Sequence, residues 1–535
     1  SCKKLQVIIC VLLVELCERF TFFGIVCNMI VFCTVKLGYG NYLAATVNLC
    51  FIGASTLTPV LVGWFAETCL GRTKVVYLCA FLHFFTAMLP VVAFPFEDFY
   101  IDTHHMVHQL EPREQQLLFY TGLLAAALGI GGIRAILCPM GAYCLQGYNQ
   151  HQLLSFFNFY WLVNLNSLVV FLGIAYIQQS VAKNLGFLIP FTSVLLALIA
   201  IHMVRSKLTY KPKKGSLLTT LGVFLNSLKM CCLHHRHLSG DVAFWLDRAK
   251  ENNGGRYSET HVENVKVLAK LFPLYGLQLL YRACITQIPS GYYIQTMNSN
   301  LHLGDQMLPI GVMNVISILP LLILAPLIEF VTTCCLSLNK TPLAPAKVIL
   351  GHACAAMSVL VAGFSELQRK AHPLVEQTLS GKVLQVSSMR CFQLASQYIL
   401  LGLAEALVTP ASLISFQLTP SHIRGISLHF LTLSYGGGCF LGALIIQLFY
   451  FFSGNFYPNT LHEGNLEGFF FLLATLMAIN TLVYWRVSYY IDLSVQGKAL
   501  TISPLTEKLL RYKACLRFYD TLDHSYRNTS VESIL

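Results

Sequence analysis

The sequence places three charged side chains close together inside a long apolar stretch. Glu15, Glu18 and Arg19 interrupt a predicted helix that runs from about residue 7 to residue 35. Residues three and four positions apart share one face of an α-helix, so these groups are within reach of one another. A charge at the centre of a bilayer costs about 2.5–3.5 kcal/mol on insertion scales and usually marks an ion or substrate pathway. A charge-compensated contact between two helices is the alternative interpretation.

A second intramembrane cation is expected at Arg134, which ends the glycine-rich run at residues 129–134 of another apolar segment. Glycines at this spacing permit close helix packing. Arg134 is therefore the predicted partner of the excess carboxylate on the first helix, with snorkelling to an interface as the alternative. Further along, Tyr160 and Asn164 would place a hydroxyl and an amide on one face of an aromatic helix. We interpret this face as a cavity wall, and plain packing is the alternative.

A short loop after the second apolar segment combines an acid, a turn and a base. Glu67, Gly71 and Arg72 are predicted to form a charge latch that gates a conformational change rather than a substrate contact. The second half of the chain is poorer in charge. In this half, Asn314 is the candidate binding residue, and Glu405 is expected deep within a helix.

Composition identifies the class of protein that carries these residues. The chain has 535 residues, of which 55% are hydrophobic and only 11% charged, and its mean hydropathy is +0.61. Soluble domains carry about 25% charged residues. Apolar runs of at least about 18 residues recur along the sequence and predict transmembrane helices. We therefore expect an all-α membrane protein with twelve spans, predicted at about residues 7–35, 42–66, 74–95, 117–142, 153–178, 185–204, 267–297, 308–333, 346–365, 390–417, 423–452 and 467–490.

The spans divide into two sets of six on either side of a basic central stretch. Most of the 36 lysines and arginines lie in segments on one side of the predicted membrane, which places both termini in the cytoplasm. The net charge of +11 thus reflects a cytoplasmic bias and not nucleic-acid binding. The expected regions are a first half at 1–204, a cytoplasmic loop at 205–266, a second half at 267–490 and a tail at 491–535.

Cysteine and histidine usage argues against a disulfide scaffold, a metal centre or an enzyme. Most of the 19 cysteines lie within apolar segments, where cysteine behaves as a small hydrophobe. A cluster in the central loop, at residues 231–237, lacks the spacing of paired zinc ligands, so a solvated, membrane-facing basic linker is expected. The sequence also shows no nucleophile–base pair, so an enzyme is the least expected class.

Taken together, the motifs resemble those of the proton-coupled oligopeptide transporter family, in its peptide/histidine branch, within the major facilitator superfamily. The first helix carries an E-x-x-E-R-F motif at Glu15–Phe20. The remaining similar segments follow in family order at residues 57–72, 129–134, 156–167, 246–249, 262–266, 397–405 and 461–467.

The resemblance implies alternating access driven by a proton gradient, with no other cofactor. Proton coupling would fall on Glu15, Glu18 and Arg19, and Arg134 would grip a peptide carboxylate. The implied partners are protons, a peptide-like or organic-anion solute and the lipid bilayer, for a monomer in the plasma membrane by default or in an endolysosomal membrane. No nucleic-acid partner is expected.

Two departures affect the predicted substrate site. Phe22 and Phe23 replace the paired tyrosines that follow the family's E-R-F, so two hydroxyl groups are lost. Ile414 aligns with the glutamate that holds a peptide's amino terminus in the family. A buried ammonium facing isoleucine would lose its charge partner, whereas a ligand with only a carboxylate would lose nothing.

Three hypotheses follow. The first is a symporter with intact proton coupling and an altered substrate, either a modified peptide or an organic anion held by Arg134 and Arg282. The second is ordinary di- and tripeptide or histidine symport, with the missing carboxylate supplied by Glu405. The third is a non-transporting sensor or scaffold that binds a solute and recruits cytosolic partners through the central loop and the tail.

Overall fold

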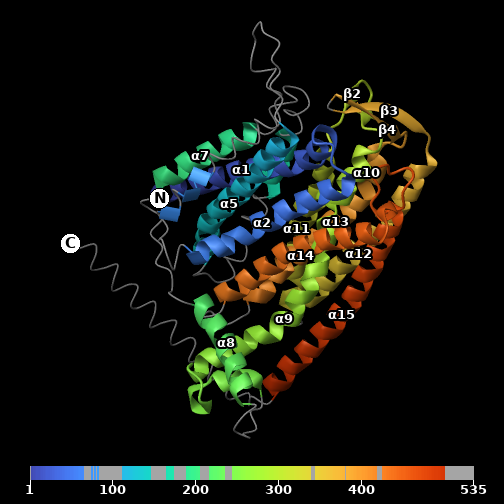
Figure 1. The fold of residues 1–535 in the computed structure, drawn as a ribbon. Helices are drawn as coiled ribbons and strands as arrows, with labels where there is room; N and C mark the ends of the chain where they lie inside the picture. The colour runs from blue at the N-terminus through green and yellow to red at the C-terminus, as the bar shows by residue number, and fades with distance from the viewer. Residues whose placement is uncertain are drawn as a thin grey trace. The chain divides into compact units, whose positions relative to one another are not determined.

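The computed structural model describes residues 2–65, 74–75, 78–79, 81–82, 111–145, 164–173, 188–204, 216–234, 244–338, 344–379, 381–417 and 424–500. Residues 1–482 form one compact unit and 483–535 a second. The described part is mainly helical (Figure 1). Seven described helices are long and apolar enough to cross a membrane. Most of the spans predicted at 74–95 and 153–178 lie outside the described residues.

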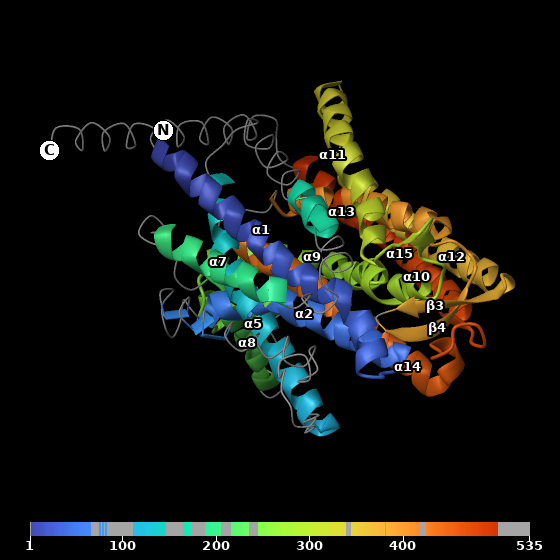
Figure 2. The same cartoon turned by 90° about the horizontal axis from the view of Figure 1, so that it is seen from above.

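The first half contributes four long described helices. Figures 1 and 2 show that α1 lies beside α7, and α2 packs against α5. A π-helical turn, η1 (Phe32–Lys36), follows α1. The spans predicted in these four places are confirmed as helices, which are α1 (Cys2–Val31), α2 (Asn41–Phe65), α5 (Pro112–Leu145) and α7 (Leu188–Val204).

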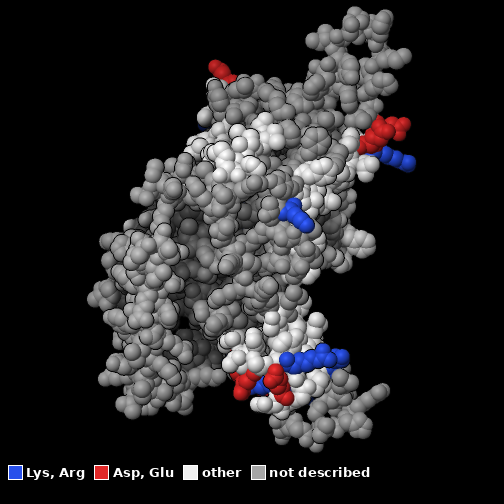
Figure 3. Space-filling view, turned by 90° about the vertical axis from the view of Figure 1, so that its left-hand side faces the viewer, with Lys and Arg blue, Asp and Glu red and all other residues white. Residues whose placement is uncertain are grey.

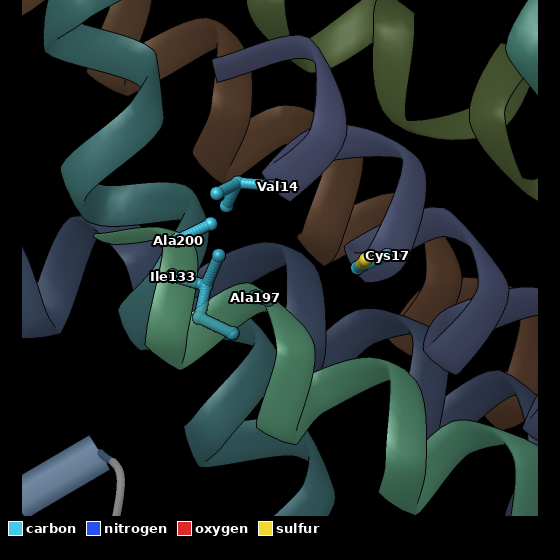
Figure 4. Packing of buried hydrophobic residues seen from close by; sticks show 5 residues of the cluster. All are labelled: Val14, Cys17, Ile133, Ala197 and Ala200. Atoms are coloured by element: carbon cyan, nitrogen blue, oxygen red, sulfur yellow. The ribbon is translucent and has the colours of Figure 1, made fainter. Parts of the chain in front are cut away.

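Small side chains let the first-half helices approach closely. Figure 4 shows Val14 and Cys17 of α1 meeting Ile133 of α5 and Ala197 and Ala200 of α7. Within a membrane, where lipid is as apolar as leucine, close van der Waals contact between small residues is what holds helices together. This cluster fixes α1 against α5, the two helices that carry the predicted ion pair.

The described part of the second half contains six long helices and two short hairpins. Helix α13 packs between α11 and α12, and α9 packs against α14. The elements are α9 (Glu259–Ile285), η10 (Ile288–Tyr292), α10 (Tyr293–Met297), β1 (His302–Leu303), β2 (Gln306–Met307), α11 (Val312–Leu338), α12 (Ala344–Ala371), β3 (Leu374–Leu379), β4 (Lys382–Ser387), η11 (Cys391–Leu394), α13 (Ala395–Gln417), α14 (Arg424–Phe452), η12 (Gly454–Phe456) and α15 (Leu466–Leu500). Strands β3 and β4 pair antiparallel from Leu374 opposite Ser387 to Leu379 opposite Lys382.

The predicted linker at 205–266 is wrong in part, because much of it is folded. It contains α8 (Ser216–His234) and the 3₁₀ turns η8 (Trp245–Ala249) and η9 (Glu251–Asn253), and α9 already begins at Glu259. These elements share a core of Val223, Leu246, Ala249, Val262 and Val265. We call this unit, residues 216–266 as far as described, the cap.

Within the cap, ion pairs hold η8 and Lys250 onto the start of α9. Lys250 Nζ lies 2.9 Å from Asp247, 2.7 Å from Glu263 and 3.2 Å from Glu259. Lys266 pairs with both Asp247 and Glu263. Figure 3 shows acidic and basic side chains gathered at the end of the molecule where α8 and the start of α9 lie. Three acidic and two basic side chains therefore join η8 and the adjacent Lys250 to the first turns of α9.

This network predicts acid sensitivity of the cap. Hydrogen bonds from Lys250, which has the larger effect, and from Lys266 lower the pKa of Glu263. A carboxyl group whose pKa is lower in the folded state than in the unfolded chain stabilises the folded state at pH values above the unfolded pKa of about 4.3. This stabilisation is lost as the pH falls through the pKa of the folded state. We expect amide hydrogen exchange of residues 245–262 to be constant from about pH 7 to pH 5, after correction for intrinsic rates, and to rise steeply below pH 4.

Glu263→Gln should exchange faster at neutral pH and lose part of this acid dependence. Glu251→Gln, at an exposed carboxylate of η9, is the matched control and should behave as wild type. An identical acid profile in wild type and Glu263→Gln would show that the network does not stabilise the cap.

Candidate functional site

The candidate site is built on an ion pair between the first and the third long described helices. Arg134 Nε on α5 donates to Glu18 Oε1 on α1 at 2.6 Å, and Arg19 Nε lies 3.8 Å from Glu18 Oε2. Glu18 is only 2% exposed. The predicted pairing of Arg134 with the first helix is thus present, and Glu18 supplies the carboxylate. The side chain of Glu15 lies outside the described part of the chain.

Aromatic rings surround this pair. The guanidinium carbon of Arg134 lies 4.7 Å from the centre of the Phe22 ring, and that of Arg19 lies 5.9 Å from Phe23. Phe23 in turn meets Phe171 at 4.3 Å between ring centres. Rings contribute a cation–π attraction and exclude water, which strengthens the Coulomb interaction. Phe22 and Phe23, which take the place of family tyrosines, therefore bind the cations through ring faces instead of hydroxyl groups.

Two glycines place Arg134 at this position. A Cβ atom on Gly131 would clash with Thr58 of α2, and one on Gly132 would clash with Cys79. The helix that carries Arg134 can therefore approach its neighbours only with glycine at both positions. This gives a steric reason for the glycine-rich run at 129–134.

A second ion pair lies in the other half of the chain. Arg282 Nη1 of α9 lies 3.0 Å from Glu405 Oε1 of α13, which also accepts from Thr409 Oγ1 at 2.9 Å. Tyr281 donates to the other carboxylate oxygen at 3.2 Å, and Arg282 lies 4.2 Å from the ring centre of Tyr435. Arg282 and Glu405, predicted separately as contacts for the two ends of a ligand, thus neutralise each other.

Asn314 lies at a contact between α1 and helices late in the chain. Its amide donates to Tyr293, whose hydroxyl lies 3.7 Å from Cys27 Sγ on α1. Asn314 is 6% exposed. The structure therefore assigns this predicted binding residue to a buried contact that joins α1, α10 and α11.

The other predicted residues are only partly placed. Asn164 is half-buried at the start of a described helix that ends at Gly173 and includes Phe171. Ile414 lies on α13, nine positions after Glu405, but its side chain is outside the described part. Tyr160, Glu67, Gly71 and Arg72 are also outside it. Glu18, Arg19, Phe23 and Arg134 are the predicted residues that the structure brings together.

A fully buried ion pair in α12 was not predicted. Glu366 and Arg369 are at most 1% exposed and form two hydrogen bonds of 2.7 and 3.0 Å. Gln295 donates to Glu366 at 2.9 Å and accepts from Gln397 at 2.8 Å, so the network crosses α10, α12 and α13. The predicted span ended at residue 365, which assigned both charges to a loop. The same three-residue spacing that marks α1 could have identified them.

No group of three or more metal-ligating side chains occurs among the residues that the structure describes. Of the predicted Cys/His cluster, Cys231 is exposed on α8. Positions 235–237 lie outside the described ranges.

Comparison with known proteins places this geometry in a family. A profile of the POT family (PTR2) matches residues 91–460. Human solute carrier family 15 member 5 is 55% identical over 530 residues, which cover 98% of this chain and 92% of the relative. The chain belongs to the POT family. The resemblance seen in its motifs is confirmed, and the protein is a multi-pass integral membrane transporter of that family.

More distant relatives agree with this POT family assignment. Mouse solute carrier family 15 member 3 is 24% identical, with 90% of each chain covered. Solved structures share the fold at low identity. An auto-inhibited POT family peptide transporter has a TM-score of 0.65 at 17% identity, with 90% of this chain and 96% of that chain covered. A POT family transporter in complex with 5-aminolevulinic acid has a TM-score of 0.64 at 15% identity, with the same coverage.

The two cations at the end of α12 provide a matched stability test. Arg369→Met leaves Glu366 buried without its partner and should lower the free energy of unfolding by about 3–5 kcal/mol. Lys370→Met is the comparison, because the side chains of the Lys370–Glu467 pair are 22% and 12% exposed, so its loss should cost less than the loss of the fully buried pair. Thermal unfolding of the purified proteins measures both. Equal effects would contradict the structural role of the buried pair.

Proposed function

We propose that this POT family member is a proton-coupled symporter of a peptide-like solute or organic anion. The observation that carries the proposal is the buried Glu18–Arg134 pair, at 2.6 Å, with Arg19 beside it. A cation that must bind a solute carboxylate is here already occupied by a carboxylate of the protein. Solute and Glu18 therefore compete for Arg134, and any event that neutralises Glu18 favours the solute.

Proton coupling follows from this competition. Protonation of Glu18 removes its negative charge and weakens its interaction with Arg134, which is then free to bind an anionic group. Return of Glu18 to the charged form re-forms the pair and displaces that group. Arg19 Nε, 3.8 Å from Glu18 Oε2, lies beside this pair. Glu15 would be part of the same proton pathway by family resemblance.

Contacts between the halves support alternating access. Asn48 of α2 donates to the Pro289 carbonyl of η10 at 2.7 Å, and Gln447 of α14 donates to Thr46 at 2.8 Å. Near the start of α2, Asn41 donates to the Pro458 carbonyl at 2.9 Å. Three such hydrogen bonds can form and break as two halves move against each other. They are expected in a conformation in which the two halves are in contact along the first part of α2.

The proposed topology has twelve spans in two halves with both termini in the cytoplasm. The first half would end near residue 204 and the second would run to about residue 490, followed by a cytoplasmic tail. The cap lies between the halves and would face the cytoplasm. The plasma membrane is the proposed location, with an endolysosomal membrane as the alternative, and the chain would act as a monomer.

The second ion pair bears on the substrate. Because Glu405 is bound by Arg282, Tyr281 and Thr409, it could hold a peptide ammonium only by leaving three partners. Ile414 supplies no charge in its place. The proposed solute is therefore a peptide whose amino group is modified, or an anion without one. An unmodified dipeptide held by Glu405 is the weaker alternative.

Glu18→Gln tests the coupling role directly. In proteoliposomes with an inward gradient of one pH unit, each coupled proton supports up to about tenfold accumulation. Wild type should accumulate one member of a panel of dipeptides, N-acylated peptides and organic anions, whereas Glu18→Gln should exchange that solute without accumulating it. Glu114→Gln, at an exposed carboxylate near the start of α5, is the control. Undiminished accumulation by Glu18→Gln would refute the coupling role, and binding without flux in wild type would favour a sensor.

Ile414→Glu tests the altered clamp. A charged hydrogen bond contributes about 1.5–3 kcal/mol, so the variant should prefer a free dipeptide over its N-acetylated form by about 10–150-fold more than wild type does. Ile414→Gln separates charge from polarity and should show little change. An unchanged preference in Ile414→Glu would mean that this position does not face the solute.

A further inference from the structure

Helix α8 of the cap presents two different faces. Val223 and Ser227 are fully buried against η8 and the start of α9, and Ser227 Oγ donates to the Leu246 carbonyl at 3.3 Å. On another face Leu221, Leu225 and Leu228 are 54%, 58% and 52% exposed. These three positions have the i, i+4, i+7 spacing of one helical stripe. We call this set of three leucines the outer stripe.

Exposure of the outer stripe to water would be costly. Burial of leucine side chains is favourable, and three in a row make an apolar surface that usually marks a contact site. Helix α8 is already packed onto the cap through its opposite face, so the outer stripe is not needed to hold the cap together. The three leucines can therefore contact a surface outside the described residues.

The position of α8 along the length of α9 indicates what covers the outer stripe. The first turns of α9 carry Glu259, Glu263 and Lys266, and α8 packs there through Val262 and Val265. Phe224 of α8 also stacks on Phe272 of α9, at 5.4 Å between ring centres, in the apolar part of that helix. Helix α8 therefore lies beside the stretch where a membrane helix changes from charged to apolar. In a membrane protein this change marks the edge of the bilayer.

Two polar and aromatic groups next to the stripe have the character of an interfacial anchor. Trp245 is 39% exposed and lies 5.9 Å from Phe224 between ring centres, and tryptophan is enriched at membrane–water interfaces. Lys229 is exposed next to Leu228. In sequence, Lys211, Lys213 and Lys214 precede α8 and add positive charge. Such charge complements the anionic lipids of a cytoplasmic leaflet.

We propose that α8 is an interfacial helix whose outer stripe inserts into the cytoplasmic leaflet beside α9, with anionic lipid headgroups at Lys229. This inference rests on the proposed topology and not on the transported solute. Because the opposite face of α8 is bound to η8 and α9, the helix would connect the lipid surface to the start of α9.

The test uses the full-length chain in lipid nanodiscs. A fluorescent amino acid replaces Leu225, and in a matched control it replaces Asn252, an exposed residue of η9. Interfacial helices bury their apolar face about 5–10 Å deep, so a nitroxide on the upper acyl chain should quench the dye at 225 but not at 252. Aqueous iodide should show the opposite preference. Omitting phosphatidylserine, or introducing Lys229→Glu, should weaken the lipid quenching at 225.

Two outcomes would overturn the proposal. Iodide quenching at 225 equal to that at 252 would show that the stripe faces water. Protection of 225 from both quenchers would show that protein covers it, either a second copy or another part of this chain. Hydrogen exchange at residues 246–249 confirms in each sample that α8 remains docked on the cap. No step requires a transported solute, so this result and the test of symport can fail separately.

Discussion

The buried carboxylate of Glu18 is the constraint on which the first half of this transporter depends. A carboxylate that is 2% exposed within an apolar helix must be paired or protonated, because an isolated charge there is strongly destabilising. Arg134 meets that requirement at 2.6 Å. Its helix reaches this position only because Gly131 and Gly132 allow close approach, and the Phe22 ring packs against the guanidinium group. Composition, packing and electrostatics thus converge on one contact.

The other ion pairs follow the same rule with different consequences. Glu366 and Arg369 are fully buried on a single helix and tied to two glutamines, so they have no simple route to exchange partners. Arg282 and Glu405 join two helices and are each more than a fifth exposed. The Glu18–Arg134 pair also joins two helices, with Arg134 19% exposed. Pairs that are shared between helices and partly exposed have the access to other partners that the proposed transport cycle requires, whereas the α12 pair is suited to holding α10, α12 and α13 together.

Much of this arrangement could be predicted from sequence because membrane helices have strong signals. Long apolar runs located the described spans, and charges at helical spacing identified the partnership of Arg134 with α1. The mutual pairing of Arg282 and Glu405 could not be predicted, because it depends on how α9 and α13 pack. The pair in α12 was missed when hydropathy ended the span one residue before Glu366. Helix α8 was missed because its charged flanks resembled a solvated linker, although its apolar periodicity was present.

The central claim is that Glu18 holds Arg134 in its charged form and releases it when protonated. Infrared difference spectroscopy of the purified protein in lipid, recorded between neutral and acidic pH, measures this without any solute. The account predicts a band from a protonated carboxyl group in wild type that is absent in Glu18→Gln, together with a change in the guanidinium bands that disappears when Arg134 is replaced by lysine. Identical difference spectra for wild type and Glu18→Gln would contradict it.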